Sequence, residues 1–571
     1  LPGQSEREKG ERKRIRLHAA DWARPTCKRL SWACSQSWWA GPSSFPSLFH
    51  LSASRVSRPP TATSTRGPSS LPPQAARQPP GRRGEASRTD AMSSPSPLCA
   101  ASGSTALRAP PPLLRFRRPA AAVSASVARA APAVSDDLVL RIAEQLEDSV
   151  TSSSPLLDPL RSASALSLLS TPWPTRRSSE AFRFTDISYL RSFPISLPSR
   201  APDLAPPASP FPSHVHFSDG LLVSASGAHV SSLADLPPGR ARDRAAAALA
   251  ASAEFAHKDL FYDFNAVGAR DVVVVHVPEG VKVADDPVQI MFTYTNCGAE
   301  SMLMSNPRIL VVAEKEAEVA IVEEHFGAGE EGGCYWANPV AEIIIDAGAR
   351  VVHSYVQRQS FAAAHTKWTV VQQDTSSKYE FVEVSTGAKL NRHNLHIQQL
   401  GPETETELST LHLTSQNKQI HDLHSKLILD HPRGFSRQLH KCIACGAGNS
   451  IFDGNIKVNR YAQQTDAGQE TKCLVLSPKA LVNVKPNLQI IADDVKCTHG
   501  AAISGDLDPN ELFYFQARGI KTDTATDALL YFFGAHVIKR IPFKPVNEKA
   551  LAQFKELLAS SRQMTNEALL S

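Results

Sequence analysis

Short runs of apolar residues, rich in valine, isoleucine and leucine, follow one another between residues 272 and 504. Glycine, asparagine, aspartate and lysine separate these runs, and no helical pattern of about ten residues or more comes between them. This pattern argues against a doubly wound α/β sheet and favours a sandwich, a barrel or a parallel β-helix. The clearest runs are residues 319–322, 343–345, 379–384, 427–429, 456–458, 473–476 and 488–491.

Small-residue turns help to choose among these three folds. Gly327, Gly348, Gly387, Gly446 and Gly468 recur at spacings near multiples of about 20 residues, which is the scale of one structural repeat. A parallel β-helix is built from such repeats. We therefore predict a mainly β protein whose core, over residues 271–505, is a parallel β-helix.

Helical patterns precede the predicted core. Apolar residues recur at helical spacing after Ser135, which is placed to cap a helix. Residues 241–256 consist almost entirely of good helix formers, whereas residues 151–240 are rich in proline and serine and predict loops and short helices. We predict an N-terminal helical and loop domain over residues 135–270.

Helical patterns also follow the predicted core. Asp508 and Pro509 are typical of the start of a helix, and residues 524–538 and 547–559 are amphipathic at helical spacing. We predict a C-terminal helical domain over residues 506–571. Such a tail either caps the last coil of the core or binds a partner, and the pattern leaves both alternatives open.

The first part of the chain has a composition unlike the rest. Residues 1–91 precede Met92, the first methionine, and we expect them to be a disordered upstream leader outside the natural protein. Residues 92–134 are rich in serine, alanine, proline and arginine and contain no acidic residue, which predicts a disordered transit peptide for a plastid. Arg115 interrupts the apolar run that a secretory signal needs, and a disordered basic tail is the alternative.

Charge and cysteine usage exclude several functions. Residues 1–134 carry 21 Lys and Arg against 6 Asp and Glu, whereas residues 135–571 carry 40 against 50. The folded part is therefore acidic, and we expect no nucleic acid as a partner. We also expect no membrane span, because no run approaches about 18 apolar residues. Six scattered cysteines after residue 134 are too irregular for a disulfide scaffold and fit a reducing compartment such as the chloroplast stroma.

Residues 493–505 carry the strongest candidate chemistry. Cys497 and His499 are two positions apart in a strand-like run, so both side chains point to one face of a strand. Thiolate and imidazole are ligands for iron or zinc, and two of them form half of a coordination shell. The alternative is that both side chains fill a buried layer.

Other motifs are weaker. Cys442 and Cys445 have metal-ligand spacing without a second pair, and we interpret them as structural. Seven histidines between residues 393 and 440 predict ladders on successive coils, with side chains facing solvent or paired with neighbours such as Asp422. These histidines are His393, His396, His412, His421, His424, His431 and His440.

The sequence argues against two enzymatic functions. No phosphate-binding loop of the Walker type occurs in the sequence, so we expect any ATP hydrolysis to occur in another chain. A β-helix enzyme acting on carbohydrate is an alternative function, with Asp493 and Asp494 as its acid pair. Adjacent residues of a strand face opposite ways, which counts against that pair.

Six sequence runs resemble a known family. They are residues 449–458, 462–467, 472–477, 485–490, 492–500 and 512–520. Together they resemble the SufD-type subunits, in their plastid form, of the SUF iron-sulfur cluster assembly machinery. Residues 174–177 and 180–186 resemble the N-terminal motif of that family, so the similarity extends over about residues 136–571. Ala480 stands near the place where SufB-like chains carry a cysteine, which favours SufD.

The resemblance implies a fold, partners and site residues. The expected fold is a right-handed parallel β-helix flanked by N-terminal and C-terminal helical domains. The expected function is that of a non-catalytic scaffold that pairs with a SufB-like paralogue and the ATPase SufC, with sulfur coming indirectly from a cysteine desulfurase and a sulfur carrier. His499 and Cys497 would contact a transient iron-sulfur cluster shared with SufB. Leu529, Phe532, Phe533 and His536 are the candidates for docking SufC, and a reduced flavin is a further cofactor that the residues themselves do not support.

Overall fold

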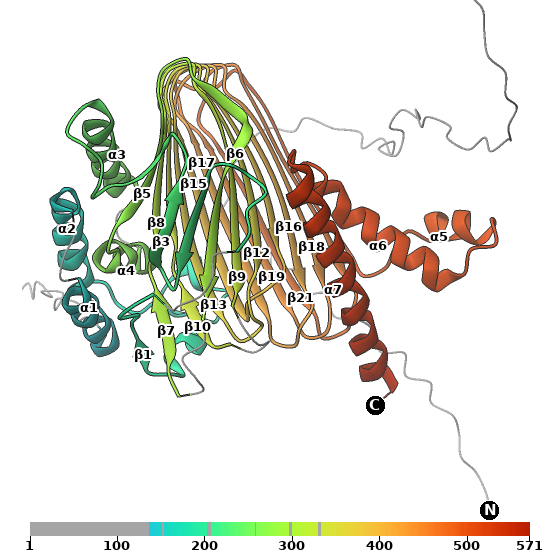
Figure 1. The fold of residues 1–571 in the computed structure, drawn as a ribbon. Helices are drawn as coiled ribbons and strands as arrows, with labels where there is room; N and C mark the ends of the chain where they lie inside the picture. Colours follow the sequence, from blue (N-terminus) through green and yellow to red (C-terminus); the bar gives the residue numbers. More distant parts are fainter. Residues whose placement is uncertain are drawn as a thin grey trace, which may run out of the picture. The chain divides into compact units, whose positions relative to one another are not determined.

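The structure is a computed structural model, and it describes residues 136–150, 154–201, 207–256, 259–295, 300–328 and 333–570. The predicted leader over residues 1–91 and the predicted transit peptide over residues 92–134 lie outside these residues. Strands of the central region wind into a parallel β-helix, and helices precede and follow it along the chain (Figure 1). The predicted fold class, mainly β with a parallel β-helix core, is confirmed.

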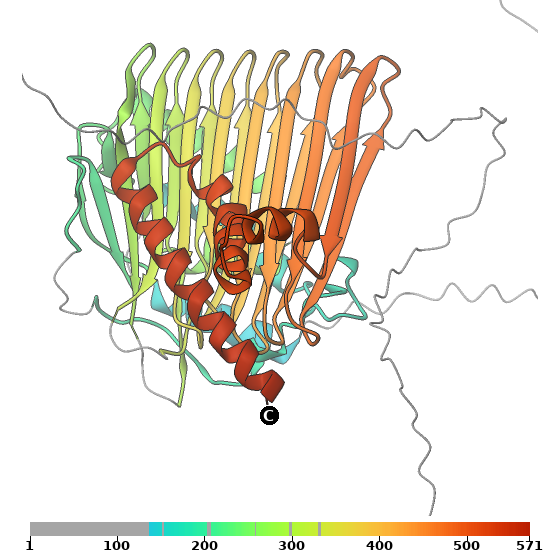
Figure 2. The same cartoon turned by 90° about the vertical axis from the view of Figure 1, so that its right-hand side faces the viewer.

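Two long sheets form the β-helix, and the coils lie side by side in Figure 2. Sheet A contains β1 (Ile195–Ser196), β4 (Val230–Ser232), β5 (Val272–Val277), β7 (Met302–Ser305), β8 (Arg308–Ala313), β10 (Tyr335–Ala337), β11 (Val340–Ile345), β13 (Ala364–Gln373), β15 (Leu390–Gln399), β17 (Ile420–Leu429), β19 (Asn449–Val458) and β21 (Leu481–Ile490). Sheet B contains β2 (His214–Ser218), β3 (Leu221–Ser226), β6 (Lys282–Tyr294), β9 (Glu318–Gly327), β12 (Arg350–Arg358), β14 (Lys378–Ser385), β16 (Glu405–Thr414), β18 (Phe435–Ala444), β20 (Thr465–Val475) and β22 (Val495–Ser504).

Each coil is longer than the sequence predicted. From β5 to β22, residues that face each other on successive coils are 26 to 36 residues apart, whereas the glycine spacing predicted about 20. Gly327 and Gly468 do not mark turns, because they lie in β9 and β20. The glycine-based repeat was therefore wrong, although the strands themselves were placed in the right regions.

The reason lies in the turns between the two sheets. Several turns between the sheets contain a residue other than glycine with a left-handed backbone, with φ between 54° and 64°, namely Glu316, Ser376, Ala388, Glu403, Lys418, Arg433 and Gln464. Glycine is the residue that most readily adopts this conformation, so a search for glycines misses turns that use other residues. The hydrogen-bonded ladders on both sides hold these residues in a conformation that they rarely adopt alone.

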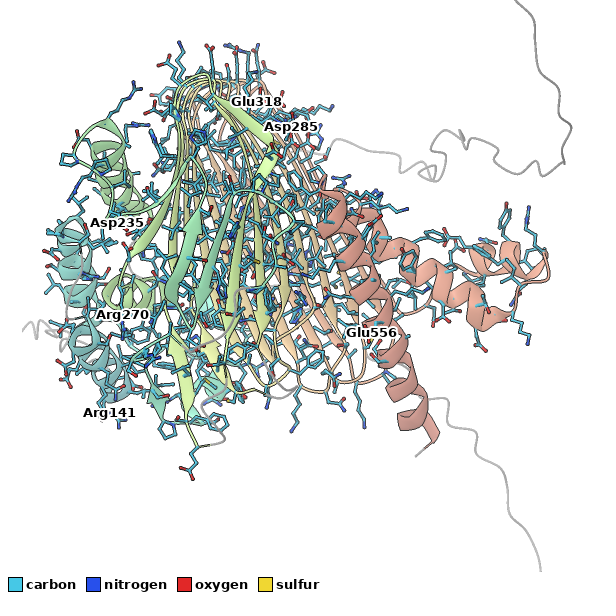
Figure 3. All side chains as sticks on the ribbon, in the orientation of Figure 1. Arg141, Asp235, Arg270, Asp285, Glu318 and Glu556 are labelled. Atoms are coloured by element: carbon cyan, nitrogen blue, oxygen red, sulfur yellow. The ribbon has the colours of Figure 1, made fainter. Side chains whose placement is uncertain are left out.

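The two ends of the β-helix differ. At the N-terminal end, β3 pairs antiparallel with β2, and β4 pairs antiparallel with β5. At the other end, β21 pairs with β19 and β22 pairs with β20, and the sheets have no further described strand. Side chains fill the space that the strands enclose, while charged residues such as Arg141 and Glu556 lie on the outside (Figure 3).

Helices and short strands of the N-terminal region cover part of sheet A. The helices are α1 (Asp137–Ser149), α2 (Asp158–Leu168), α3 (Arg240–Ala256) and α4 (Leu260–Gly268), with short helical turns Pro155–Leu157, Glu180–Phe182 and Ser188–Arg191. Phe261 and Phe264 of α4 pack on the ring of Trp336, on the outer face of sheet A. The predicted cap Ser135 lies outside the described residues, and Asp136 caps α1 through the backbone N–H of Leu138. Residues 151–240 contain β1 to β4 in addition to the predicted loops and short helices.

A buried ion pair joins the N-terminal region to the β-helix. The guanidinium of Arg392 contacts the carboxylate of Asp422 and lies 4.0 Å from the ring centroid of Phe182. Thr185 donates to the same carboxylate at 2.5 Å, and His424 lies 3.0 Å from it, which confirms the predicted pairing of a histidine with Asp422. Burial opposes ionisation of this carboxylate, but the charges of His424 and Arg392 hold its pKa at about 2.

We predict that Asp422 stabilises the fold above pH 4 and loses this contribution in acid. Its pKa is lower in the folded chain than the ordinary value of about 3.9, so folding is favoured while the carboxylate is ionised. The contribution of about 2–3 kcal/mol should decline as the pH falls from about 4 to 2. Urea unfolding of Asp422→Asn should show a deficit against wild type at pH 6 that narrows below pH 4, whereas the exposed control Asp506→Asn should show no deficit.

Helices follow the β-helix along the chain, and the last two of them pack on the outer face of sheet B. The helices are α5 (Pro509–Gln516), α6 (Thr522–Ile538) and α7 (Lys544–Leu570), and Asp508 caps α5 as predicted. Figure 2 shows α7 running across the strands, and α6 packs on β14, β16 and β18. Leu530 of α6 and Phe554 of α7 belong to one buried cluster with outward-facing residues of sheet B such as Leu411. α6 and α7 therefore pack on the outer face of sheet B and not on the last coil, so the alternative that the tail caps the last coil is wrong.

We predict that Gly534→Ala loosens the tail. A Cβ atom at this position would lie 2.2 Å from Cζ of Phe554, which is far below a van der Waals contact. The resulting displacement of α6 and α7 should lower the free energy of unfolding by about 1–3 kcal/mol in a denaturant titration. Gly500→Ala is the matched control, because no atom lies within 4 Å of a Cβ placed there. Equal stability of the two variants would contradict the packing.

Candidate functional site

The last coil of the β-helix is an open edge. Among the strands that the structure describes, β21 and β22 each pair on one side alone. Backbone N–H and C=O groups on their other side are therefore placed to bind a further strand. Several apolar side chains are exposed here, namely Leu481, Ile490, Ile491 and Ile503, with exposed fractions of 42% to 60%. We call β21 and β22 together with these side chains the open coil.

Cys497 and His499 lie on β22, within the open coil. In the register of the sheet, Cys497 faces Ala467 and His499 faces Gln469, and both of these partners point into the β-helix. The two candidate residues therefore share the inward face of the last strand. Cys497 is half-buried and packs against the interior cluster, whereas His499 is exposed. The alternative that both side chains fill a buried layer therefore applies in part to Cys497 and does not apply to His499.

The chemistry of this pair is limited by what surrounds it. Burial raises the pKa of the Cys497 thiol above its ordinary value. Among the residues that the structure describes, no group of three His, Cys, Asp or Glu side chains is arranged to hold a metal ion. A cluster bound to Cys497 and His499 would need its remaining ligands from another molecule, because iron-sulfur clusters generally take about four protein ligands.

The C-terminal helices carry exposed aromatic residues. Phe513 and Tyr514 of α5 are 68% and 55% exposed, and Phe532 of α6 is 55% exposed. In Figure 1, α5 extends away from the β-helix, at the far end of α6. Exposed aromatic side chains are typical of surfaces that bind another protein. Phe532 was among the predicted docking residues and Phe513 and Tyr514 were not, although the run of aromatic residues 513–515 in a short predicted helix could have indicated them.

The four residues predicted to dock an ATPase lie on one side of α6, at helical spacing, but differ in exposure. Phe532 and His536 are exposed and Leu529 is half-buried. Phe533 turns toward sheet B, where Nζ of Lys441 lies 4.4 Å from its ring centroid and donates to its backbone carbonyl at 3.0 Å. Burial, followed by the nearby charge of Lys472, lowers the pKa of Lys441 to about 8. Phe533 therefore contacts the β-helix through Lys441, and its role in docking stays a prediction.

The remaining cysteine and histidine motifs are internal. Cys445 lies in the apolar cluster beneath α7, whereas Cys442 lies opposite Cys473 of the next coil, and both are buried. Cys442 and Cys445 are therefore structural, as predicted. Most histidines of residues 393–440 are paired with neighbours, which was one of the two predicted alternatives, and four of them are fully buried inside the β-helix instead of facing solvent. These four are His393, His412, His421 and His440.

The fold and the open coil together define a class of protein. This is a parallel β-helix whose last described coil has one unpaired strand edge, with a thiol and an imidazole on that edge strand and a helical tail along one sheet. No helix among the described residues is both long enough and apolar enough to cross a membrane.

Comparisons with known proteins identify the family. Residues 294–533 match the family model for the SufBD core domain of SUF-system FeS cluster assembly. The chloroplastic protein ABCI7 of Arabidopsis thaliana is 47% identical over 472 residues, which are 78% of this chain and 96% of the relative. A SufBD family iron-sulfur cluster assembly protein of Synechocystis is 36% identical over 50% of this chain and 63% of its own length. The SufD protein of Escherichia coli is 28% identical over 51% of this chain and 67% of its own length.

The chain therefore belongs to the SufBD family of iron-sulfur cluster assembly proteins, and its resemblance to SufD is confirmed. Family membership supports a role in the SUF system and does not favour the alternative of a carbohydrate-active enzyme. The chloroplastic relative supports a plastid location for this chain.

Proposed function

We propose that this chain is a non-catalytic scaffold subunit of the SUF system in the chloroplast stroma, which pairs with a SufB-like paralogue through its open coil. The observation that carries the proposal is the exposed imidazole of His499 on an edge strand without a described partner. A strand of the partner would extend the ladder of sheet A or sheet B and cover apolar side chains such as Ile490 and Ile503. Main-chain hydrogen bonds would give affinity, and side chains of the edge would give specificity.

Pairing at the open coil would place a nascent cluster between the two chains. His499 and Cys497 share one face of β22, so a partner coil stacked on this strand would meet both side chains. The iron-sulfur cluster is cargo, transient and shared with SufB, which would supply the remaining ligands. Sulfur would arrive indirectly from a cysteine desulfurase and its carrier.

The helical tail would bind a SufC-like ATPase. Phe513, Tyr514 and Phe532 supply the exposed aromatic surface, and Phe533 fixes α6 to β18 through Lys441. ATP hydrolysis would occur in the partner and would act on this chain through α5 and α6. Deletion of residues 521–571 is a poor test of this idea, because α6 and α7 cover apolar side chains of sheet B such as Val352 and Leu411. Single substitutions on the exposed face are sharper.

The rival function, hydrolysis of carbohydrate, finds no support at the proposed acid pair. Asp493 and Asp494 are exposed and lie in the bend before β22, so the expectation that they occupy a strand was wrong. The backbone carbonyl of Asp494 accepts from Gln464 at 2.6 Å, which fixes this bend to the preceding coil. The two carboxylates belong to a turn at the rim of the open coil.

We predict that His499→Ala lowers cluster yield without preventing assembly of the complex. Removal of the imidazole deletes one ligand, while the backbone edge that binds the partner stays in place. In a complex reconstituted with SufB-like and SufC-like subunits, iron and sulfide per complex should fall by about tenfold or more. Thr498→Ala is the matched control on the opposite face of β22 and should keep the wild-type yield. A normal yield with His499→Ala would remove the ligand role.

We predict that Phe532→Ala weakens binding of the ATPase. Loss of an aromatic anchor from the centre of an interface costs about 2 kcal/mol or more, which is a rise in Kd of about thirtyfold. Titration of the full chain with the SufC-like subunit by calorimetry measures this change. Tyr461→Ala is the control, because Tyr461 is 77% exposed and lies in the turn between β19 and β20. Equal affinity of both variants for the ATPase would show that Phe532 is not part of the docking surface.

A further inference from the structure

The interior of the β-helix contains charged side chains that do not balance. Among the described residues that point inward from β9 to β18, Glu323, Lys367 and Glu383 have ionisable carboxylate or ammonium groups, and all three are fully buried. Nζ of Lys367 lies 2.5 Å from Oε1 of Glu323, so these two charges neutralise each other. Glu383 is left without a lysine or arginine partner.

Two imidazoles and a hydroxyl surround Glu383 instead. Its carboxylate lies 2.9 Å from Nδ1 of His393 and 3.0 Å from Nε2 of His412, and Ser385 donates to it at 2.7 Å. Oγ1 of Thr369 lies 2.9 Å from the other nitrogen of His393. We call Glu383, His393 and His412 the buried triad. With both imidazoles neutral, the triad would carry an isolated negative charge in the interior.

An isolated charge is not stable there. Removing one unpaired carboxylate from water costs several kcal/mol even after the surroundings relax, and a proton held by the same group cancels that cost. A proton cancels this cost whether it is bound to either imidazole or to the carboxyl group itself. If Lys367 were neutral, Glu323 would also lack a balancing positive charge, and the interior would then need two protons in place of one.

Further buried polar atoms lead from the triad toward the open coil. The ring of His412 lies 5.1 Å from that of His440, measured between centroids, and Oγ1 of Thr410 lies 2.7 Å from Nδ1 of His440. Thr471 of β20 faces His440 of β18 on the coil before it, and Ala501 of β22 on the last coil. Nδ1 of His412, Nε2 of His440 and Oγ1 of Thr471 are buried and have no protein partner. Buried polar atoms of this kind are bridged by water in folded proteins.

We infer that the buried triad stores one proton, and that His440, Thr471 and bridging water connect this store to the open coil. This inference rests on the proposed function, because the proton would serve the chemistry of the cluster at that edge. The transfer makes and breaks N–H and O–H bonds alone: a proton leaves His412 at Nδ1, reaches Nε2 of His440 through water, and passes by Thr471 to solvent at the open coil. The reverse path refills the store.

The surroundings of Glu383 fix which groups hold the proton. The titratable side chains that face it from the packed strands are Tyr355, Lys367, Tyr379, His393, His412, His421 and His440. Burial lowers the pKa of His421 to about 3 and that of His440 well below its ordinary value. Burial therefore disfavours the cationic form of both imidazoles, which leaves the triad as the site of the proton.

The store is tested on the isolated full-length chain, without any partner. NMR of the chain with labelled histidine and glutamate at pH 8 should show one cationic imidazole, at His393 or His412, or a protonated carboxyl at Glu383. Exposed histidines are neutral at this pH. Glu383→Gln should abolish the signal, whereas Glu380→Gln, which is the matched control on the outer face of β14, should keep it. Neutral imidazoles together with an ionised Glu383 in the wild type would overturn the inference.

The path is tested in the reconstituted complex. His440→Phe keeps a ring against Phe452, whose centroid lies 4.5 Å away, but removes both nitrogens. The rate of cluster formation should fall about tenfold or more, and its solvent deuterium isotope effect should change, while unfolding and partner binding stay as in the wild type. His440→Gln serves as the second variant if His440→Phe does not fold. An unchanged rate with His440→Phe, beside a loss with His499→Ala, refutes the path and leaves the proposed function intact, whereas no loss in either variant refutes the proposed function.

Discussion

The stacking of each coil on the one before it, through parallel backbone hydrogen bonds, is the constraint on which the structure depends. In-register pairing fixes which side chains point inward and which point outward from β5 to β22, apart from one shift in β6 between Val283 and Val288. It also means that a β-helix has no natural end, because each new coil presents the same unpaired edge as the last. At the N-terminal end antiparallel strands β3 and β4 close the edge, and at the other end the chain turns away into α5.

Inward-facing polar residues are the second consequence of that constraint. Register forces a position on every coil to face the interior, so any polar residue there must find its partner inside. Glu323 does so with Lys367, His325 and His353, and Glu383 with His393 and His412. A buried polar network with an unpaired member destabilises the fold. The identity of each inward-facing residue therefore matters more than its hydrophobicity. The interior is therefore both a core and a chemical environment.

The sequence predicted what depends on short-range pattern and missed what depends on stacking. Alternating apolar runs indicated the β-helix, Asp508 marked the start of α5, and spacing by two placed Cys497 and His499 on one face. The length of a coil was not readable, because residues such as Glu403 occupy left-handed turns without being glycine. The burial of the histidines could not be predicted either, since polar residues in strands usually indicate a solvated face. The orientation of Phe533 depended on Lys441, which lies some 90 residues away in sequence.

The position of the helical tail links the two proposed interfaces by a short route. α6 is fixed to β18 through Lys441 and Phe533, and the open coil begins two strands further along the same sheet, at β22. Neighbouring strands are about 4.8 Å apart, so roughly 10 Å of hydrogen-bonded sheet separates the anchor of α6 from the strand of His499. Continuous backbone ladders join β18 to β20 and β20 to β22, so the contact of α6 is connected to the strand of His499 through hydrogen-bonded sheet. A tail that capped the last coil would have covered the edge, whereas a tail on the side of sheet B leaves the edge open and connects α6 to it through the sheet.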